Sequence, residues 1–116
     1  MDIVLRQLSA GDVPVLSVAG EVDLATAPQL RDALVRLALD NPGATVVIDL
    51  DGVALLDSVG LGVLIGGLRR MRATGGDVAV VCTTPRLTEL LTLCRLDRVF
   101  EIHASVAAAA GVIDRG

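Results

Sequence analysis

The chain has 116 residues with 53% hydrophobic and 21% charged side chains, a balance that predicts one folded domain and excludes a disordered chain. Its net charge is −4, its ten basic residues are all arginine, and its one aromatic residue is Phe100. Proteins that bind duplex nucleic acid carry a basic patch, and those that bind single strands use aromatic stacking, so we expect no direct contact with nucleic acid.

The cysteines and the apolar runs indicate the compartment. Cys82 and Cys94 both lie in apolar patterns, which predicts two buried reduced thiols rather than a disulfide or a metal pair. The first residues show no basic segment followed by a long apolar run, so no signal peptide is expected. The longest uncharged apolar run, 59–68, is about half of what a membrane span requires. We therefore expect a cytoplasmic protein without a membrane span.

The first third of the chain predicts a hairpin and a helix. Strand-like runs at 3–8 and 13–20 are joined by the turn-rich segment "SAGD". Behind Thr26, a candidate N-cap, Pro28 lies in the first turn, where its missing N–H costs little. Apolar residues then recur at i, i+3, i+4, i+7 and i+8, which is the spacing of one helix face, until "NPG" at 41–43 ends the helix.

The rest of the chain alternates short apolar strands with helices. The run 45–50 is β-branched and almost wholly apolar, as is typical of a strand buried on both faces. A later helix is predicted to begin with Pro85 behind the candidate cap Thr84, and its inward face comprises Leu87, Leu90, Leu91 and Cys94. The elements expected after the first helix are a strand at 45–50, a helix from Ser58 to about Thr74, a strand at 77–82, the helix behind Thr84, a strand at 98–102 and a helical end after Ser105.

The predicted order of elements is β-β-α-β-α-β-α-β-α. Strands that alternate with helices of ten or more residues imply βαβ units, and such units build a largely parallel sheet. We therefore predict a single α/β domain over 1–116, with a mixed, mostly parallel sheet of about five strands and about four helices.

Parallel βαβ units bring their strand-to-helix loops to the carboxyl edge of the sheet, where ligands usually bind. Three predicted loops meet this condition: 20–26, 51–58 and 83–85. If the chain has a functional site, we expect it at this edge. The loops would make neighbours of four polar residues that are far apart in the sequence: Asp23, Asp51, Asp57 and Ser58.

These residues give little support to enzyme chemistry. Ser58 lacks the first glycine of a G-x-S-x-G elbow, and the one histidine, His103, follows a strand predicted on the far side of the sheet. Asp51 and Asp57 are six residues apart, without a histidine or cysteine at the spacing that a metal requires. The "GLG" at 60–62 does not follow its strand directly, as a dinucleotide-binding loop would. We expect no enzyme, no metal and no cofactor.

Ser58 has a structural and a functional interpretation. The structural one is a helix N-cap. Four glycines follow in "LDSVGLGVLIGG", however, and each glycine inside a helix costs roughly 1 kcal/mol against alanine. We interpret Gly60 and Gly62 as gaps that let another protein approach the serine. Gly66 and Gly67 are interpreted as sites of tight helix–sheet packing.

Three segments together resemble a known family. "LDSVGLGVL" (56–64) is similar to the phosphorylation motif of bacterial anti-sigma-factor antagonists, the STAS-domain family. "GEVDLATAPQLRDAL" (20–34) resembles the strand–loop–helix segment of that family, and 75–109 is similar to its C-terminal half. The resemblance covers essentially the whole chain, so it implies one STAS domain.

The resemblance also implies roles for individual residues. The phosphorylated serine of the family corresponds to Ser58, the acid beside it to Asp57, and the acid of the first strand-to-helix loop to Asp23. Relatives often carry Ser or Thr directly after the acceptor, where this chain has Val59, so a second acceptor is missing. The partner-binding surface that the resemblance implies comprises Asp23, Asp57, Ser58, Val59, Gly60, Leu61 and Gly62.

The family works by exchanging partners, and the resemblance implies the same here. Relatives bind an anti-sigma factor that is also a serine kinase, which frees a sigma factor for transcription. The kinase, with ATP and magnesium, phosphorylates the serine and ends the complex, and a phosphatase reverses the modification. The alternative is a STAS scaffold or transport-associated subunit in which Ser58 is only a cap. The sequence leaves open whether the chain is a monomer or a weak homodimer.

Overall fold

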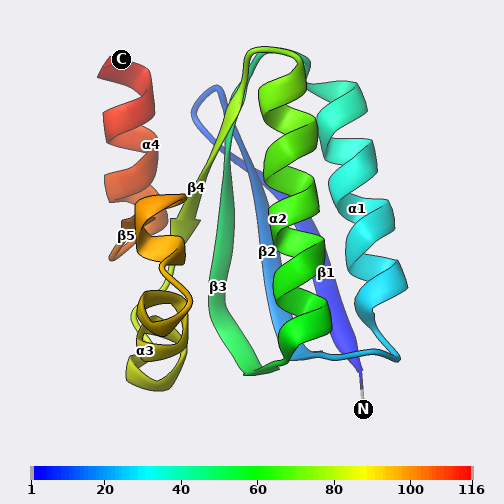
Figure 1. Ribbon diagram of the computed structural model, residues 1–116. Helices are drawn as coiled ribbons and strands as arrows, with labels where there is room; N and C mark the ends of the chain where they lie inside the picture. The colour runs from blue at the N-terminus through cyan, green and yellow to red at the C-terminus, as the bar shows by residue number, and fades with distance from the viewer. Residues whose placement is uncertain (1, 116) are drawn as a thin grey trace.

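The computed structural model describes residues 2–115, and it confirms the predicted order of elements and the mixed, mostly parallel sheet (Figure 1). Five strands lie in the order β1-β2-β3-β4-β5, with β1 antiparallel to β2 and the other pairs parallel. The elements are β1 Ile3–Ala10, β2 Val13–Val22, α1 Ala27–Asp40, β3 Thr45–Leu56, α2 Ser58–Ala73, β4 Asp77–Val81, α3 Pro85–Leu93, the 3₁₀ turn η1 Leu96–Arg98, β5 Glu101–His103 and α4 Val106–Arg115.

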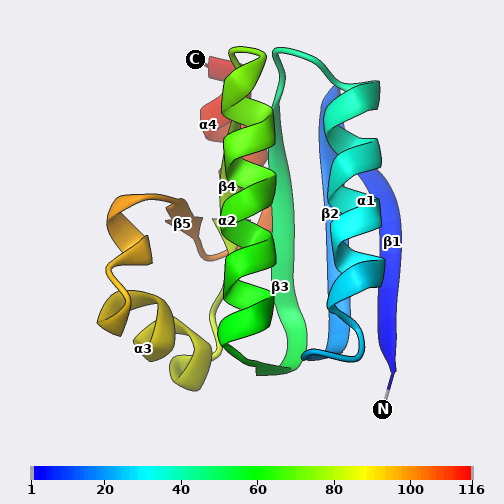
Figure 2. The same cartoon turned by 45° about the vertical axis from the view of Figure 1, so that its right-hand side comes forward.

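The two faces of the sheet carry cores of different size. Helices α1 and α2 lie side by side on one face, and α4 lies on the other (Figures 1 and 2). Successive strand residues point to opposite faces, so Ile48 joins the larger core under α1 and α2, and its neighbour Val47 joins the smaller core with Ala109 of α4. The central strands are therefore buried on both sides, as their apolar sequences predict.

Strand β3 is longer than predicted, because the expected strand ended at residue 50 and the observed one continues to Leu56. The polar pair Asp51 and Gly52 is typical of a turn, but pairing with β2 extends as far as Val22 opposite Leu56. Two register shifts along this pairing accommodate the extra residues of β3. Since β4 pairs with β3 only up to Asp49, the last part of β3 has a strand neighbour on one side only.

The segment after α3 also differs from the prediction. The last strand covers 101–103 rather than 98–102, because η1 occupies part of the expected range. Helix α3 ends at Leu93, and the backbone turns at Arg95, whose φ of 58° lies in the left-handed region. Cys94 is consequently exposed, and the prediction that it faces the core is wrong; Cys82 is buried as predicted.

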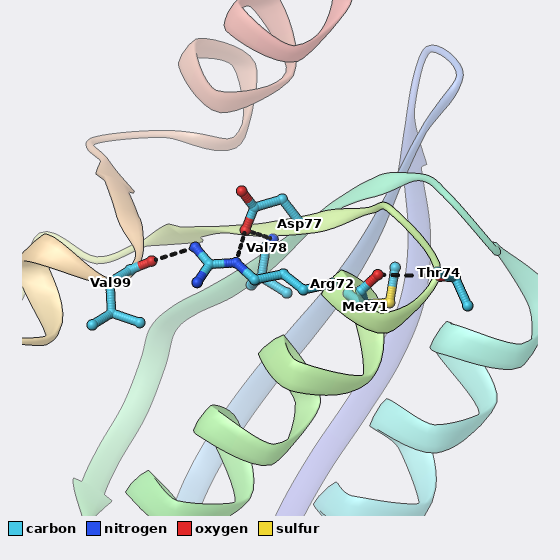
Figure 3. A network of polar contacts seen from close by, with 6 residues as sticks. All are labelled: Met71, Arg72, Thr74, Asp77, Val78 and Val99. Carbon is cyan, nitrogen blue, oxygen red and sulfur yellow. Dashed lines mark hydrogen bonds and ion pairs between the residues drawn. The ribbon is translucent and has the colours of Figure 1, made fainter.

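A polar network fixes the C-terminal end of α2 (Figure 3). The Nε of Arg72 donates to Oδ1 of Asp77 over 3.2 Å, and its Nη2 donates to the carbonyl oxygen of Val99 over 3.1 Å. The same Asp77 oxygen accepts the backbone N–H of Val78 over 2.8 Å. One arginine therefore joins α2 to the start of β4 and to the segment before β5. Among the helices described, none has the length and apolar character needed to cross a bilayer.

Candidate functional site

Two of the three predicted strand-to-helix segments, 20–26 and 51–58, meet at one end of the sheet, whereas 83–85 contacts β3 at Asp51. The loop between β2 and α1 and the junction between β3 and α2 lie at the same end of the molecule in Figures 1 and 2. The backbone N–H of Asp57 donates to the carbonyl oxygen of Val22 over 3.1 Å, which ties the two segments together. Asp23, the residue after Val22, is therefore close to the start of α2, where Ser58 lies.

Asp23 organises its own loop. Its Oδ1 accepts the backbone N–H groups of Ala25, over 2.9 Å, and of Thr26, over 3.0 Å. Thr26 takes the N-cap position of α1, as predicted, but its hydroxyl makes no capping bond to that helix. The hydroxyl donates to the carbonyl oxygen of Glu21 over 2.7 Å and accepts the N–H of Asp23 over 3.0 Å. The loop is thus held by its own side chains, in the manner of an Asx turn.

Asp57, rather than Ser58, caps α2. The Asp57 Oδ1 accepts the backbone N–H of Gly60 over 2.9 Å, and Ser58 is the first residue inside the helix. The interpretation of Ser58 as the N-cap is therefore wrong. Its side chain is exposed at a helix start, where the partial positive charge of the helix N-terminus favours an anionic group.

The glycines of α2 do not all have the roles that were predicted from the sequence. A Cβ on Gly60 would lie 2.6 Å from Val22 Cγ1 and 2.7 Å from Leu56 Cδ1, so this glycine permits close packing of α2 on β2 and β3. Gly62 faces open space, as expected of a gap. A Cβ on Gly67 would lie 2.9 Å from Leu34 Cδ1, so Gly67 serves contact with α1 rather than with the sheet. A Cβ on Gly66 would meet only the Arg70 side chain, at 3.6 Å, so the predicted packing of both glycines on the sheet is wrong.

The predicted partner-binding residues differ in exposure. Ser58, Gly62 and Val59 are exposed, and Val59 retains 37% of its accessible surface. Gly60 is buried, and Leu61 is only 8% exposed and belongs to the larger core. Asp23 and Asp57 are half-buried. Gly60 and Leu61 therefore lie beneath this surface, and a rigid partner would meet the other five residues.

Asp51 does not join this group. It lies within β3 rather than in a loop, and its neighbour Gly52 pairs with Ala19, three residues before the pair of Val22 and Leu56 that precedes Asp57. Its Oδ1 instead accepts the backbone N–H of Thr83 over 2.7 Å and the Thr83 hydroxyl over 3.0 Å. Asp51 thereby ties the loop before α3 to β3.

A groove that the sequence does not predict lies between the end of β3 and α3. We call it the β3–α3 groove; its cavity volume is about 380 Å³. The strand side is 53–56, and the helix side includes Leu87, Leu90 and Leu93. The unexpected length of β3 creates this groove, because β4 has already ended where the groove begins. The apolar periodicity of a single helix or strand does not predict such a groove, because the groove lies between two elements.

Two features of the described residues bear on alternative chemistry near Ser58, namely the metal-ligating side chains and the one histidine. Within residues 2–115 no three His, Cys, Asp or Glu side chains come together in a way that could hold a metal ion. His103 lies on the edge strand β5, opposite Val81 of β4, with its Nε2 3.8 Å from Oε1 of Glu101. It is thus two strands away from β3, whose end leads into Ser58.

Comparison with known proteins agrees with this geometry. The STAS domain family matches residues 8–109. The anti-sigma-F factor antagonist RsfB of Mycobacterium tuberculosis is 39% identical over 107 residues, covering 89% of this chain and 87% of that protein. The anti-sigma-B factor antagonist of Bacillus subtilis is 36% identical over 89 residues, covering 77% of this chain and 80% of that protein. A crystal structure of an anti-sigma factor antagonist from Mycobacterium paratuberculosis is 32% identical with a TM-score of 0.88, covering 97% and 95% of the two chains.

Proposed function

The chain belongs to the STAS domain family, and we propose that it acts as an anti-sigma-factor antagonist. In this role it binds an anti-sigma factor and thereby releases the sigma factor which that protein holds. The observation that carries the proposal is the exposed Ser58 at the start of α2, with Asp57 supplying the helix cap beside it. The relatives named as antagonists match most of the chain at 36–39% identity, which supports the same role.

Phosphorylation of Ser58 is the proposed off-switch. The anti-sigma partner acts as a serine kinase: a bond forms between the Ser58 Oγ and the γ-phosphorus of ATP, and ADP and a proton are released. The phosphoryl group adds a charge of about −1.5 to −2. The helix dipole stabilises that charge by roughly 0.3–1 kcal/mol, so α2 keeps its first turn. A phosphatase restores the free hydroxyl.

Electrostatic repulsion and desolvation give the switch its strength. A doubly charged phosphate about 6 Å from one carboxylate costs on the order of 1–5 kcal/mol, depending on the effective dielectric constant. Asp57 supplies a carboxylate next to Ser58 in the sequence, and Asp23 lies at the same end of the sheet. This repulsion acts within one chain, so it weakens the complex only as far as the partner excludes water and lowers the dielectric constant around these charges. A partner surface fitted to a bare serine adds the cost of desolvating the phosphate. A loss of about 4 kcal/mol corresponds to a roughly thousandfold weaker complex.

In this scheme the chain is a substrate and a binding module rather than a catalyst. Its proposed partners are an anti-sigma factor with kinase activity and a phosphatase. Since bacterial transcription takes place in the cytoplasm, the proposed role places the protein there. The exchange requires only the local change at Ser58, without rearrangement of the sheet.

The proposal is tested first by mass spectrometry. The purified protein is incubated with ATP, Mg²⁺ and each anti-sigma factor kinase encoded in the same genome. We expect one phosphoryl group per chain, mapped to Ser58 and absent from Ser58→Ala. Failure of every such kinase to modify the protein would remove the phosphorylation switch from the proposal.

Binding affinity separates the switch from a constitutive scaffold. Calorimetry with the cognate anti-sigma factor is expected to give a Kd for Ser58→Asp at least tenfold above that of the unmodified protein, because the new carboxylate partly imitates the phosphate. Ser58→Asn is the uncharged control and should bind within a few-fold of wild type. Equal affinity of all three proteins would favour the scaffold alternative.

A further inference from the structure

The two edges of the sheet are protected to different degrees. At one edge, β5 is only three residues long, and so short a strand offers little backbone for pairing. At the other edge, β1 is eight residues long and pairs with β2 alone, in a register without a bulge. Its sequence has no proline or lysine, and Figure 2 shows it at the outer margin of the sheet. The outward backbone groups of β1 are therefore open to a further strand.

The side chains of β1 also suit a paired strand. Ile3 and Leu5 are half-buried and pack against the larger core. On the opposite face, Val4 is 52% and Leu8 is 56% exposed. Arg6 lies between them and carries the only charge within β1. A long edge strand with exposed apolar side chains is a place where another chain adds a strand.

Asp2 extends this exposed face by one charged residue. Its carbonyl oxygen accepts the backbone N–H of Glu21, in the neighbouring β2, over 3.3 Å, which holds Asp2 in line with β1. Side chains alternate along a strand, so Asp2, Val4 and Arg6 lie on one face. The free edge therefore carries an exposed acid and an exposed base at equal distances on the two sides of Val4.

We infer that β1 pairs with β1 of a second copy of this chain, antiparallel and about a two-fold axis at Val4. In this register the two Val4 side chains lie opposite each other, and each Asp2 lies opposite Arg6 of the other copy. Opposite charges on facing residues stabilise a strand pair, and like charges destabilise it. Among the symmetric registers of residues 2–10, only this one places an acid opposite Arg6, because Asp2 is the only acid in that range.

The contact is short and symmetric. It pairs residues 2–6 of each chain, so the same surface patch serves on both copies. Stable protein interfaces bury about 1,200–2,000 Å² in total, which so few residues do not reach, and we therefore expect a weak dimer that forms with rising concentration. The inference is independent of the proposed function, since none of these residues belongs to the surface around Ser58.

Reversal of single charges tests the pairing. In sedimentation experiments over a dilution series, we expect Arg6→Asp to raise the dimer Kd roughly tenfold or more, because each new carboxylate would face Asp2 of the other copy. Asp2→Arg should have the same effect. Arg86→Asp is the matched control, an exposed arginine on α3, on the far side of the sheet from β1. It should stay within twofold of wild type.

Mixing the two charge variants distinguishes pairing from a general effect of charge. A mixture of Asp2→Arg and Arg6→Asp should dimerise like wild type, because every facing pair again has opposite signs. All variants should keep the circular dichroism spectrum of wild type, since both positions are exposed. Wild type that sediments as a monomer at every concentration would overturn the inference. A dimer that neither charge variant weakens would overturn it as well, because the contact would then lie elsewhere.

A disulfide tests the position of the axis. Facing residues of antiparallel strands have Cβ atoms about 4.5–5.5 Å apart, close enough for oxidation to join them. In a Cys94→Ser background, which removes the exposed thiol, Val4→Cys should form a disulfide-linked dimer. Leu8→Cys is the control, because the proposed register separates its two copies by eight residues, or roughly 27 Å. Equal cross-linking of both variants would contradict the register.

Discussion

Asp57 and Ser58 are adjacent, and either residue type commonly caps a helix. The structure assigns the cap to Asp57 through its bond to the Gly60 N–H, and it leaves Ser58 exposed one position later. The proposed phosphorylation switch depends on the cap and the phosphate acceptor being different residues. A serine that also capped the helix would lose its capping bond on modification, whereas the Asp57–Gly60 bond does not involve the Ser58 hydroxyl.

The two residues should therefore differ in their effect on stability. We expect Asp57→Ala to lower the free energy of unfolding by about 0.5–2 kcal/mol, because the first turn of α2 loses its cap. Ser58→Ala should change it by no more than about 0.5 kcal/mol, as is usual for an exposed side chain. Urea unfolding followed by circular dichroism measures both values.

The control for this pair is Asp57→Asn, since asparagine is as good a cap as aspartate. It should retain most of the stability that Asp57→Ala loses. Equal destabilisation by Ser58→Ala and Asp57→Ala would contradict the assignment of the cap.

At the scale of the element, two glycines let α2 approach its neighbours more closely than residues with side chains would. Gly60 allows the helix to approach β2 and β3, and Gly67 allows it to approach α1. Gly62 makes no such contact and lies on the exposed surface beside the serine. One helix therefore contains glycines that serve packing and a glycine that leaves an open surface, and only the neighbouring elements distinguish them.

Alanine substitutions should separate these roles. Gly60→Ala is expected to destabilise the fold by about 1–3 kcal/mol, because the new methyl group would overlap Val22 and Leu56. Gly62→Ala should stabilise it by roughly 0.5–1 kcal/mol, since the helix gains propensity without a clash. Denaturant midpoints with unchanged m-values would measure both effects. A stabilising Gly60→Ala would show that the contact with β2 is not tight.

At the scale of the whole molecule, the two cores are joined by the strands they share. Val80 and Val81 are neighbours on β4, and both are almost fully buried. Val80 packs in the larger core below α1 and α2, and Val81 packs in the smaller core below α4. Since the same strand carries both side chains, a disturbance of either core reaches the strand that supports the other.

We therefore expect one unfolding transition for the whole domain. Val80→Ala and Val81→Ala should each lower its stability by about 1–3 kcal/mol, and each should shift the same transition to lower urea concentration. Circular dichroism is the suitable signal, because the chain has no tryptophan or tyrosine. A separate early transition in Val81→Ala would instead mean that α4 and its core unfold independently.

The order of elements, the sheet class and the end of the sheet that carries the candidate site could be predicted from the sequence. Apolar periodicity marks each helix face, and proline marks the first turns of α1 and α3. The alternation of strands and helices then brings Asp23, Asp57 and Ser58 to one edge. These signals are local, because each depends on residues within a few turns of one another, and the single sequence contains them in full.

Only the tertiary structure decided which other residues of the chain each of these residues contacts. Pairing with β2 carries β3 past its polar residues to Leu56, which moves Asp51 into the strand and opens the β3–α3 groove. Packing against distant elements separates Gly60 from Gly62, and the end of α3 exposes Cys94. The physical reason is that strand pairing and burial depend on atoms brought together from across the chain, whereas propensity and spacing describe only neighbours in sequence.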